Sequence, residues 1–338
     1  MPQALVTGGT GFVGVHLCRS LLARGYQVVA LDVNDPDGHF PAAADFNRGD
    51  VCRLPDVERA ARGCDVVIAN AALVPLTQVS PQEFLRVNSG GTRNTMEAAW
   101  RGGCYAAYVS SSAIFGIPQA NPLPSDARMA PFEPYGRSKA AAEMVVREFR
   151  QRGMRVASLR PRTLVGDGRL GLFEVIFNRV RAGKSVPLFG QGNNRVQLCD
   201  VTDYANAVIA AVESEATGDF NIGADRFGTV REDIDDLILA AGSPSSVIPI
   251  PVWLLKAILI PATALKLSPF GPWHWNHASR DFYFETSTAE RALNWAPERS
   301  NAEALIAAYR CFDPDEGDAG GSAHRQPVSR LVGRLLRI

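Results

Sequence analysis

The 338-residue sequence predicts an α/β fold, a Rossmann-type doubly wound parallel sheet with a smaller, interleaved C-terminal substrate lobe. Two observations predict the sheet. Short β-branched runs alternate with longer helical patterns from Gln3 to Arg162, and the first run leads into a glycine-rich turn that opens a helix. Strands that alternate with helices form right-handed βαβ units and a parallel sheet covered on both faces. The change of this rhythm after Val165 predicts the smaller lobe.

The predicted strands of the first part are short apolar runs that precede helical patterns. They read ALVTG at 4–8, QVVALD at 27–32, DVVIAN at 65–70, AAYVSSS at 106–112 and RVASLRP at 155–161. A further strand is expected just before Asp50. Downstream, VQLCDVTDYANAVIAAVES indicates a return to the sheet and then a helix, and DFNIGA indicates another strand.

These patterns set the expected domain boundaries. Residues 1–165 form the Rossmann domain, and 196–224 return to it. Residues 166–195 and 225–311 form the substrate lobe. From Asp313 the composition DPDEGDAGGSAHRQP is typical of a solvated linker, so 312–338 are expected to be a flexible tail.

Composition and charge exclude several classes of protein. An apolar content of 46% is enough for a full core, and 35 basic residues balance 35 acidic ones, so no overall field attracts nucleic acid or an anionic membrane. The six cysteines lie far apart without a CxxC pair, which predicts reduced thiols in the cytoplasm. We expect no secretion signal, and no metal site, because His274 and His277 lack nearby cysteines or carboxylates.

The most apolar stretch is 247–267. It contains three prolines and two lysines, which are unfavourable in a membrane-spanning helix. A core or interface helix pair is favoured, and a lid over an apolar pocket or a contact with one membrane face is the alternative.

A glycine-rich turn, TGGTGFVG at 7–14, directly follows the first strand and opens a helix. Glycines in this context let the backbone approach a pyrophosphate, whose charge then lies at the positive end of the helix. Asp32 ends the second strand about 20 residues later, where a carboxylate accepts the ribose hydroxyls and repels a 2′-phosphate. The pattern therefore predicts NAD rather than NADP. Asp50, Val51 and Ala71 follow other strands and are expected to line the same groove.

Tyr135 and Lys139 lie four residues apart at the start of a strong helical pattern, so they share one helix face. A free phenol has a pKa near 10, and a nearby ammonium lowers it by stabilising the phenolate. Such a tyrosine can take the proton of a secondary alcohol while hydride leaves for a nicotinamide. Ser112, at the end of the fifth strand, could hydrogen-bond the same oxygen.

Five motifs in order, TGGTGFVG, NAA, SSSAIFG, PYGRSK and RPRTLVGDG, resemble the extended short-chain dehydrogenase/reductase family, also called the NAD-dependent epimerase/dehydratase family. The resemblance covers most of the chain. It implies that Ser112, Tyr135 and Lys139 are the catalytic trio and that Asn88 supports the cofactor. It also implies cofactor contacts for Gly8, Gly11, Phe12, Val13, Asp32, Asp50, Val51, Ala71, Tyr135, Lys139, Pro161 and Arg162, the last two closing over the nicotinamide end.

Within that family, sugar-nucleotide 4,6-dehydratases place an Asp-Glu pair after the catalytic hydroxyl residue, and this chain has Ala113 and Ile114 there. The resemblance therefore favours a 4-epimerase-like enzyme acting on a nucleotide sugar. Substrate contacts are implied for Ser112, for Arg195, which matches a diphosphate-binding arginine, and for Arg280, which could replace a missing RPGD-like segment. Thr163 is a further candidate, at a position where many such enzymes carry asparagine.

Two other functions remain open at this point. A ketoreductase or 3β-hydroxysteroid-dehydrogenase-like enzyme would use the apolar region 247–275 as a hydrophobic substrate pocket. A non-catalytic NAD-binding scaffold would keep the glycine turn and lose the chemistry. The partner expected in every case is a small molecule, and the resemblance also implies a homodimer.

Overall fold

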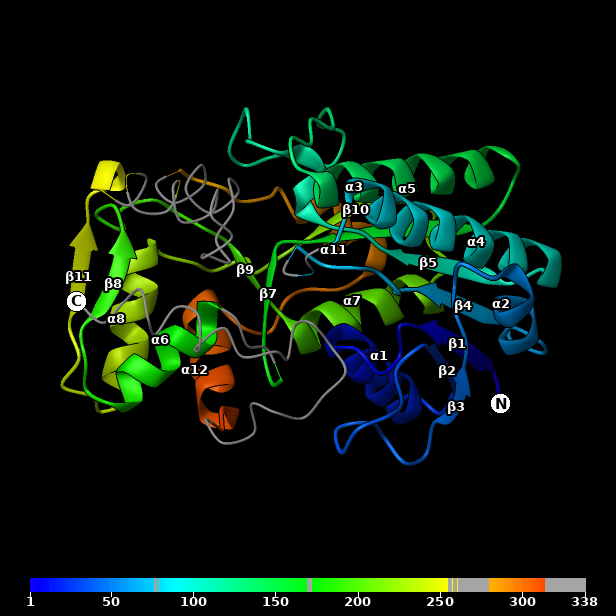
Figure 1. Ribbon diagram of the computed structural model, residues 1–338, viewed down its shortest axis with the longest axis horizontal. Coiled ribbons are helices and arrows are strands. Elements are labelled where there is room, and N and C mark those ends of the chain that lie inside the picture. Colours follow the sequence, from blue (N-terminus) through cyan, green and yellow to red (C-terminus); the bar gives the residue numbers. More distant parts are fainter. Residues whose placement is uncertain are drawn as a thin grey trace.

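A computed structural model describes residues 1–313 of the chain except 76, 78, 169–171, 255, 256, 258, 259 and 261–279. Two elongated lobes lie side by side, with the larger, N-terminal lobe on the right in Figure 1. Most of the expected flexible tail, much of the apolar stretch 247–267, and the His274 and His277 pair lie outside the described residues. Among the described residues no helix combines the length and apolarity needed to span a membrane.

The larger lobe is built on a seven-stranded parallel sheet in the order β10-β6-β5-β4-β1-β2-β3. The five strands inside the edge strands β3 and β10 are buried on both faces, as their apolar runs predict. The order reverses between β1 and β4, which is where open α/β sheets bind ligands. The strands are β1 Gln3–Thr7, β2 Gln27–Asp32, β3 Asp45–Arg48, β4 Val66–Ala69, β5 Tyr105–Val109, β6 Val156–Pro161 and β10 Gly218–Ile222. The predicted doubly wound fold is confirmed.

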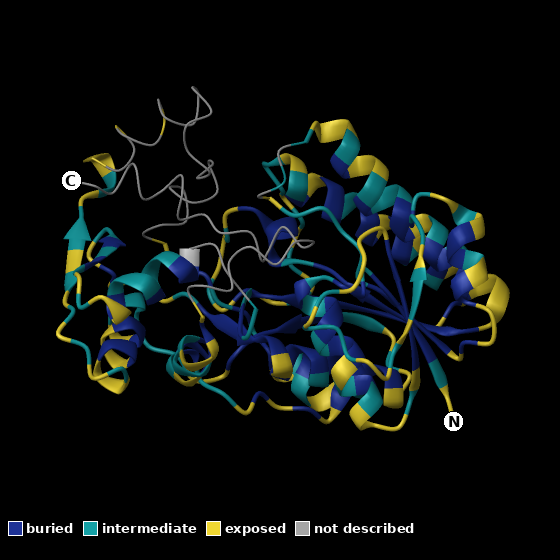
Figure 2. Cartoon of the chain, turned by 60° about the horizontal axis from the view of Figure 1, so that its bottom comes forward, coloured by how far each residue is buried: buried dark blue, intermediate teal, exposed yellow. Residues whose placement is uncertain are grey.

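Helices cover both faces of this sheet, and their outer sides are exposed (Figure 2). One face packs on α1 Phe12–Ala23, α7 Val201–Glu213 and α11 Ser287–Leu293. The other face packs on α2 Leu54–Ala60, α4 Gly91–Gly102 and α5 Pro134–Gln151. The short α3 Pro81–Phe84 and the π-helix η1 Leu85–Gly90 lead into α4.

The smaller lobe has its own apolar core. Its helices are α6 Leu172–Arg181, α8 Val230–Ala240 and α12 Asn301–Cys311, and its strands β8 Val186–Phe189 and β11 Val247–Ile250 pair in parallel. Both α8 and α12 begin with a capping box, Thr229 with Glu232 and Ser300 with Glu303. A capping box satisfies two backbone N–H groups that a helix start would leave unpaired.

One predicted strand pairing is wrong. The segment around 198–200 was expected to rejoin the main sheet, but β9 Leu198–Asp200 pairs with β7 Thr163–Val165 in a separate two-stranded sheet. Both edges of β6 are occupied, by β5 and β10, and β9 pairs with β7, the continuation of the chain beyond β6. The return to the main sheet is made by β10 instead.

Candidate active site

The turn between β1 and α1 is a cradle that only glycine can form. Gly8 has φ +67°, and a Cβ there would lie 2.7 Å from the Ala71 Cα. A Cβ on Gly14 would lie 2.1 Å from the Gly8 carbonyl oxygen. Gly11 is the N-cap of α1 and offers no side-chain cap, so the first N–H groups of α1 are open to an anion.

Asp32 lies at the carboxyl end of β2, nearly buried beside this turn. Its carboxylate accepts hydrogen bonds from the backbone N–H groups of Thr10, at 3.2 Å, and Asn34, at 3.1 Å. The two arginines that could attract a 2′-phosphate are paired elsewhere: Arg48 with Asp35 and Arg53 with Asp56.

The other predicted cofactor residues of this lobe surround the same edge of the sheet. The Ala71 N–H donates to Thr7 Oγ1 at 3.2 Å, which joins the ends of β1 and β4. Val51 packs on Gly91 so closely that a Cβ at Gly91 would lie 2.7 Å from Val51 Cγ2. Asp50 accepts from the Cys52 N–H, while Phe12 is buried and Val13 packs against the core under α1.

Lys139 is buried in α5, with 2% of its surface exposed. Its Nζ donates to the Val109 carbonyl oxygen at 2.6 Å and lies 4.5 Å from the centre of the Tyr108 ring. Burial lowers the pKa of Lys139 to about 7, and the Glu143 carboxylate opposes this shift. Since Val109 is the last residue of β5, this hydrogen bond connects α5 to the strand that precedes Ser112.

Tyr135 lies one turn before Lys139, on the same face of α5, and is half-buried. Its ring packs edge-to-face on Phe84, with 6.2 Å between ring centres. Ser112 is buried at the start of the 3-10 helix η2 Ser112–Phe115, directly after β5. The three predicted catalytic residues thus come from the end of β5 and the first two turns of α5.

Asn88 connects the cofactor groove to the catalytic helix. It lies in the π-helix η1, a distortion that often occurs at functional sites. Its side chain accepts from the Leu73 N–H at 2.7 Å and donates to the Leu73 carbonyl and to Ser138 Oγ, at 3.1 and 2.9 Å. Ser138 in turn donates to the Tyr135 carbonyl oxygen at 2.7 Å.

Arg162 follows Pro161 at the end of β6, and its side chain reaches Ser112. Its Nη1 donates to Ser112 Oγ at 3.0 Å, and its Nε donates to the Phe282 carbonyl oxygen at 3.2 Å. The guanidinium lies 3.9 Å from the centre of the Phe282 ring. This contact with Ser112 was not foreseen from the sequence, which had implied only a place over the nicotinamide. Thr163 begins β7, beyond Arg162.

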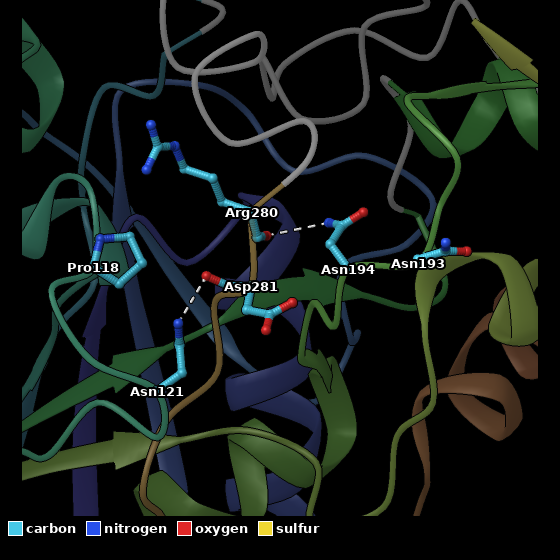
Figure 3. Close-up of a pocket in the computed structure, with 6 residues that line it drawn as sticks. All are labelled: Pro118, Asn121, Asn193, Asn194, Arg280 and Asp281. Carbon is cyan, nitrogen blue, oxygen red and sulfur yellow. Dashed lines mark hydrogen bonds between the residues drawn. The ribbon is translucent and has the colours of Figure 1, made fainter. Parts of the chain in front are cut away.

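A polar pocket of about 460 Å³ lies between segments of the two lobes (Figure 3). Arg280 and Asp281 line the pocket. Two other loops contribute its remaining lining residues, which are Pro118, Asn121, Asn193 and Asn194. The Arg280 side chain extends away from the Asp281 carboxylate. Asn121 and Asn194 hold the backbone of this segment by donating to the Asp281 and Arg280 carbonyl oxygens, at 3.0 and 3.2 Å.

Arg195 stands outside the residues that line this pocket. Its guanidinium is 4.8 Å from the centre of the Phe227 ring and 5.2 Å from that of Tyr283, and it donates to the Phe227 carbonyl. The structure therefore brings Arg280 to the pocket and leaves Arg195 packed against two aromatic rings that also contact each other.

Sequence reasoning missed three asparagines of the pocket and one carboxyl of the catalytic helix. Asn121, Asn193 and Asn194 lie on loops without a sequence motif. Glu133 is the N-cap of α5, two residues before Tyr135, and burial raises its pKa to about 7. Its place directly before the PYGRSK motif was the available signal.

The donor set fits an NAD cofactor. A glycine cradle that a Cβ would fill, an uncapped helix N-terminus and a carboxylate at the end of β2 are suited to a pyrophosphate and a ribose. The model of the NAD dependent epimerase/dehydratase family matches residues 4–223. The chain belongs to this family. It is therefore an NAD-dependent enzyme, as the five motifs predicted.

Curated relatives differ in how much of the chain they match. An uncharacterised protein of Sinorhizobium fredii, y4nG, is 38% identical over 98% of this chain and 85% of its own length. Human sterol-4-alpha-carboxylate 3-dehydrogenase is 26% identical over 92% of this chain and 88% of its own length. UDP-glucose 4-epimerase of Azospirillum brasilense is 29% identical over 55% of this chain and 53% of its own length.

Solved structures share the fold over nearly the whole chain. UDP-glucose 4-epimerase of Thermotoga maritima, solved with UDP-glucose, has a TM-score of 0.76 and 24% identity over 92% of this chain and 98% of that one. The Thermus thermophilus UDP-glucose 4-epimerase complex with NAD has a TM-score of 0.73 and 27% identity over 92% and 98%. The fold of both lobes is therefore that of nucleotide-sugar epimerases.

Proposed function

We propose that this enzyme transfers hydride reversibly at a secondary alcohol of a nucleotide sugar, in the manner of a 4-epimerase. The observation that carries the proposal is the polar pocket between the lobes, lined by three asparagines, Arg280 and Asp281. Hydroxyl and phosphate groups find hydrogen-bond partners on such a surface, whereas an apolar substrate would cover polar groups there, such as the Arg280 guanidinium, without bonding them. Arg280 is the proposed phosphate contact.

In the proposed reaction Tyr135 takes the proton of the substrate hydroxyl and later returns it. Lys139, four residues along α5, stabilises the phenolate by its positive charge. Ser112 donates its O–H to the same substrate oxygen, because Arg162 already donates to Ser112 Oγ and leaves the hydroxyl proton free. Bound NAD would supply the hydride acceptor, held by the glycine turn and Asp32.

A second candidate is a dehydrogenase acting on an apolar hydroxy compound. It is favoured because the sterol-4-alpha-carboxylate 3-dehydrogenase match extends through the second lobe, whereas the Azospirillum epimerase match covers about half of the chain. The second lobe chooses the substrate in this architecture, so similarity there carries information on substrate class. Trp253 is exposed just after β11 and could belong to an apolar contact surface.

Product analysis with NAD-loaded protein separates the two candidates. UDP-glucose, UDP-N-acetylglucosamine and a 3β-hydroxysteroid are incubated separately, and products are identified by chromatography while absorbance at 340 nm reports NADH. A 4-epimer formed without net NADH supports the epimerase. NADH formed in equal amount to a ketosteroid supports the dehydrogenase and excludes the first proposal. If neither substrate class reacts, both candidates fail.

A further inference from the structure

Arg162 is a buried cation in the reacting centre. Only 5% of its surface is exposed, and its backbone N–H donates to the Ile222 carbonyl oxygen at the end of β10. The side chain is fixed by Ser112 Oγ, by the Phe282 carbonyl and by the Phe282 ring, as described above. Every one of these partners is neutral.

No carboxylate of the described residues lies within ion-pair distance of the Arg162 guanidinium. Another buried arginine, Arg160, differs in this respect. Arg160, two residues earlier on β6, is equally buried, and it pairs with Glu143 at 2.6 Å and Asp219 at 2.7 Å. Buried charges in proteins are normally paired, since desolvation is unfavourable without a counter-ion. Burial accordingly lowers the pKa of Arg162 to about 9, with no acidic neighbour to oppose the shift. Within the part of the chain that the structure describes, the positive charge beside Ser112 therefore has no counter-ion.

We infer that Arg162 binds a carboxylate of the substrate, on a carbon next to, or one removed from, the carbinol carbon. The inference rests on the proposed function, because it takes Ser112 as the group that contacts the reacting oxygen. Two successive hydrogen bonds, from guanidinium to Ser112 and from Ser112 to the substrate, bring the reacting oxygen within about 6 Å of Arg162. A carboxylate at the proposed position on the substrate therefore lies within reach of those N–H groups of the Arg162 guanidinium that do not bond Ser112 or Phe282.

Two kinds of substrate carry this chemistry. A nucleotide sugar of the uronic acid type has its carboxylate on C5, the ring carbon next to C4, and a 3-hydroxy acid has its carboxylate on C2, the carbon next to its hydroxyl carbon. Both present an anion to Arg162 while the hydroxyl faces Ser112. A planar guanidinium can bind a carboxylate through two parallel hydrogen bonds, which fixes the orientation of the carbinol as well as adding affinity.

Paired probes that differ in charge test the inference by binding alone. UDP-glucuronate is compared with UDP-glucose, and 3-hydroxydecanoate with its methyl ester, by titration calorimetry at pH 7.5. The protein is loaded with NADH, so that the alcohols cannot be oxidised. The expected result is that one acid binds about 100-fold more tightly than its neutral partner, the size of effect that a buried charged hydrogen bond gives. Which acid binds tells the two sources apart.

Three variants complete the design. Arg162→Gln should reduce the ratio of acid to neutral affinity to near one, and Arg162→Lys should keep part of it because the charge remains. Arg101→Gln removes a positive charge from the exposed Glu58 and Glu97 pairs and should keep the full ratio. A ratio near one in the wild type, no binding of either acid, or an unchanged ratio in Arg162→Gln would overturn the inference.

Turnover of the same four probes by NAD-loaded protein separates this inference from the proposed function. Oxidation or epimerisation without preference for an acid leaves the proposed function standing and removes the role of Arg162. Preferential binding of an acid that is never turned over supports the anion site and contradicts the proposed chemistry.

Discussion

Lys139 shows how strongly the surroundings of a single side chain set its charge. Its ammonium is buried against a carbonyl oxygen and an aromatic ring, and Glu143 is the acidic group that supports its charged form. The folded-state pKa of about 7 lies well below the ordinary value of 10.5. The unfolded chain therefore binds more protons than the folded one between these two values, and stability rises with pH across that window.

This difference predicts a pH-dependent effect of Lys139→Met. The variant should be more stable than the wild type below pH 7, because it removes a buried charge, and the advantage should shrink as pH rises from about 7 towards 10.5. Urea unfolding of the cofactor-free proteins at pH 6, 8 and 9.5 measures it. If the difference in unfolding free energy between the variant and the wild type does not change with pH, then Lys139 does not change its protonation state in this window.

The sequence predicted side chains whose partners lie nearby along the chain. Tyr135 and Lys139 are four apart, and Asp32 follows the glycine turn at a fixed spacing, so periodicity alone places them. Arg162 could not be read in this way, because its partners Ser112 and Phe282 are 50 and 120 residues away. Its chemistry follows only from the folded arrangement.

At the scale of secondary structure, the π-helix η1 sets the position of Asn88. A wider turn before α4 lets this side chain bond Leu73 and Ser138 together, and so joins the loop after β4 to α5. Helical periodicity predicts a helix there but not its widened turn. The pairing of β9 with β7 escaped prediction for a related reason, since it depends on where the folded chain places two segments that lie far apart in the sequence.

Asn88→Ala should weaken this connection. The expected cost is about 1–3 kcal/mol in the free energy of unfolding, because the half-buried Leu73 N–H loses its acceptor. We also expect kcat to fall more than NAD affinity, since α5 loses the bond that positions Ser138 beside Tyr135. Chemical denaturation and steady-state kinetics measure the two effects. An unchanged kcat in a destabilised protein would limit Asn88 to a structural role.

A buried ion pair fastens α5 to β6 and the edge strand β10. Glu143 accepts from Arg160 through both carboxylate oxygens and from Ser110, and Arg160 also pairs with Asp219. Glu143→Gln should cost about 3–5 kcal/mol, because it leaves the buried Arg160 short of a counter-ion. The control Glu148→Gln breaks the exposed pair with Arg93 and should have a far smaller effect, because solvent screens an exposed pair. Equal costs in urea unfolding would contradict this account.

At the scale of the whole molecule, the α4 and α5 side of the larger lobe exposes apolar surface. Met144 on α5 is 56% exposed and Trp100 on α4 is 37% exposed. We propose that these two helices form the interface of a homodimer, in which each copy buries the same patch. Light scattering should give twice the mass of the chain, and Met144→Glu should shift the protein towards the monomer.

Leu239→Glu is the matched control for the interface. It introduces the same charge at a residue of α8 that is 80% exposed in the smaller lobe, and it should leave the mass unchanged. A monomeric wild type, or dissociation by Leu239→Glu alone, would contradict the interface.

The central claim is that Tyr135 exchanges the proton that accompanies hydride transfer. A single-turnover measurement of absorbance at 340 nm tests it most directly. NAD-loaded protein is mixed with one substrate, chosen as the one of UDP-glucose, UDP-glucuronate and 3-hydroxydecanoate that the enzyme turns over. The wild type should form NADH transiently or stably, and Tyr135→Phe should form it at least about 100-fold more slowly with NAD binding retained. Equal rates in the two proteins would contradict the account.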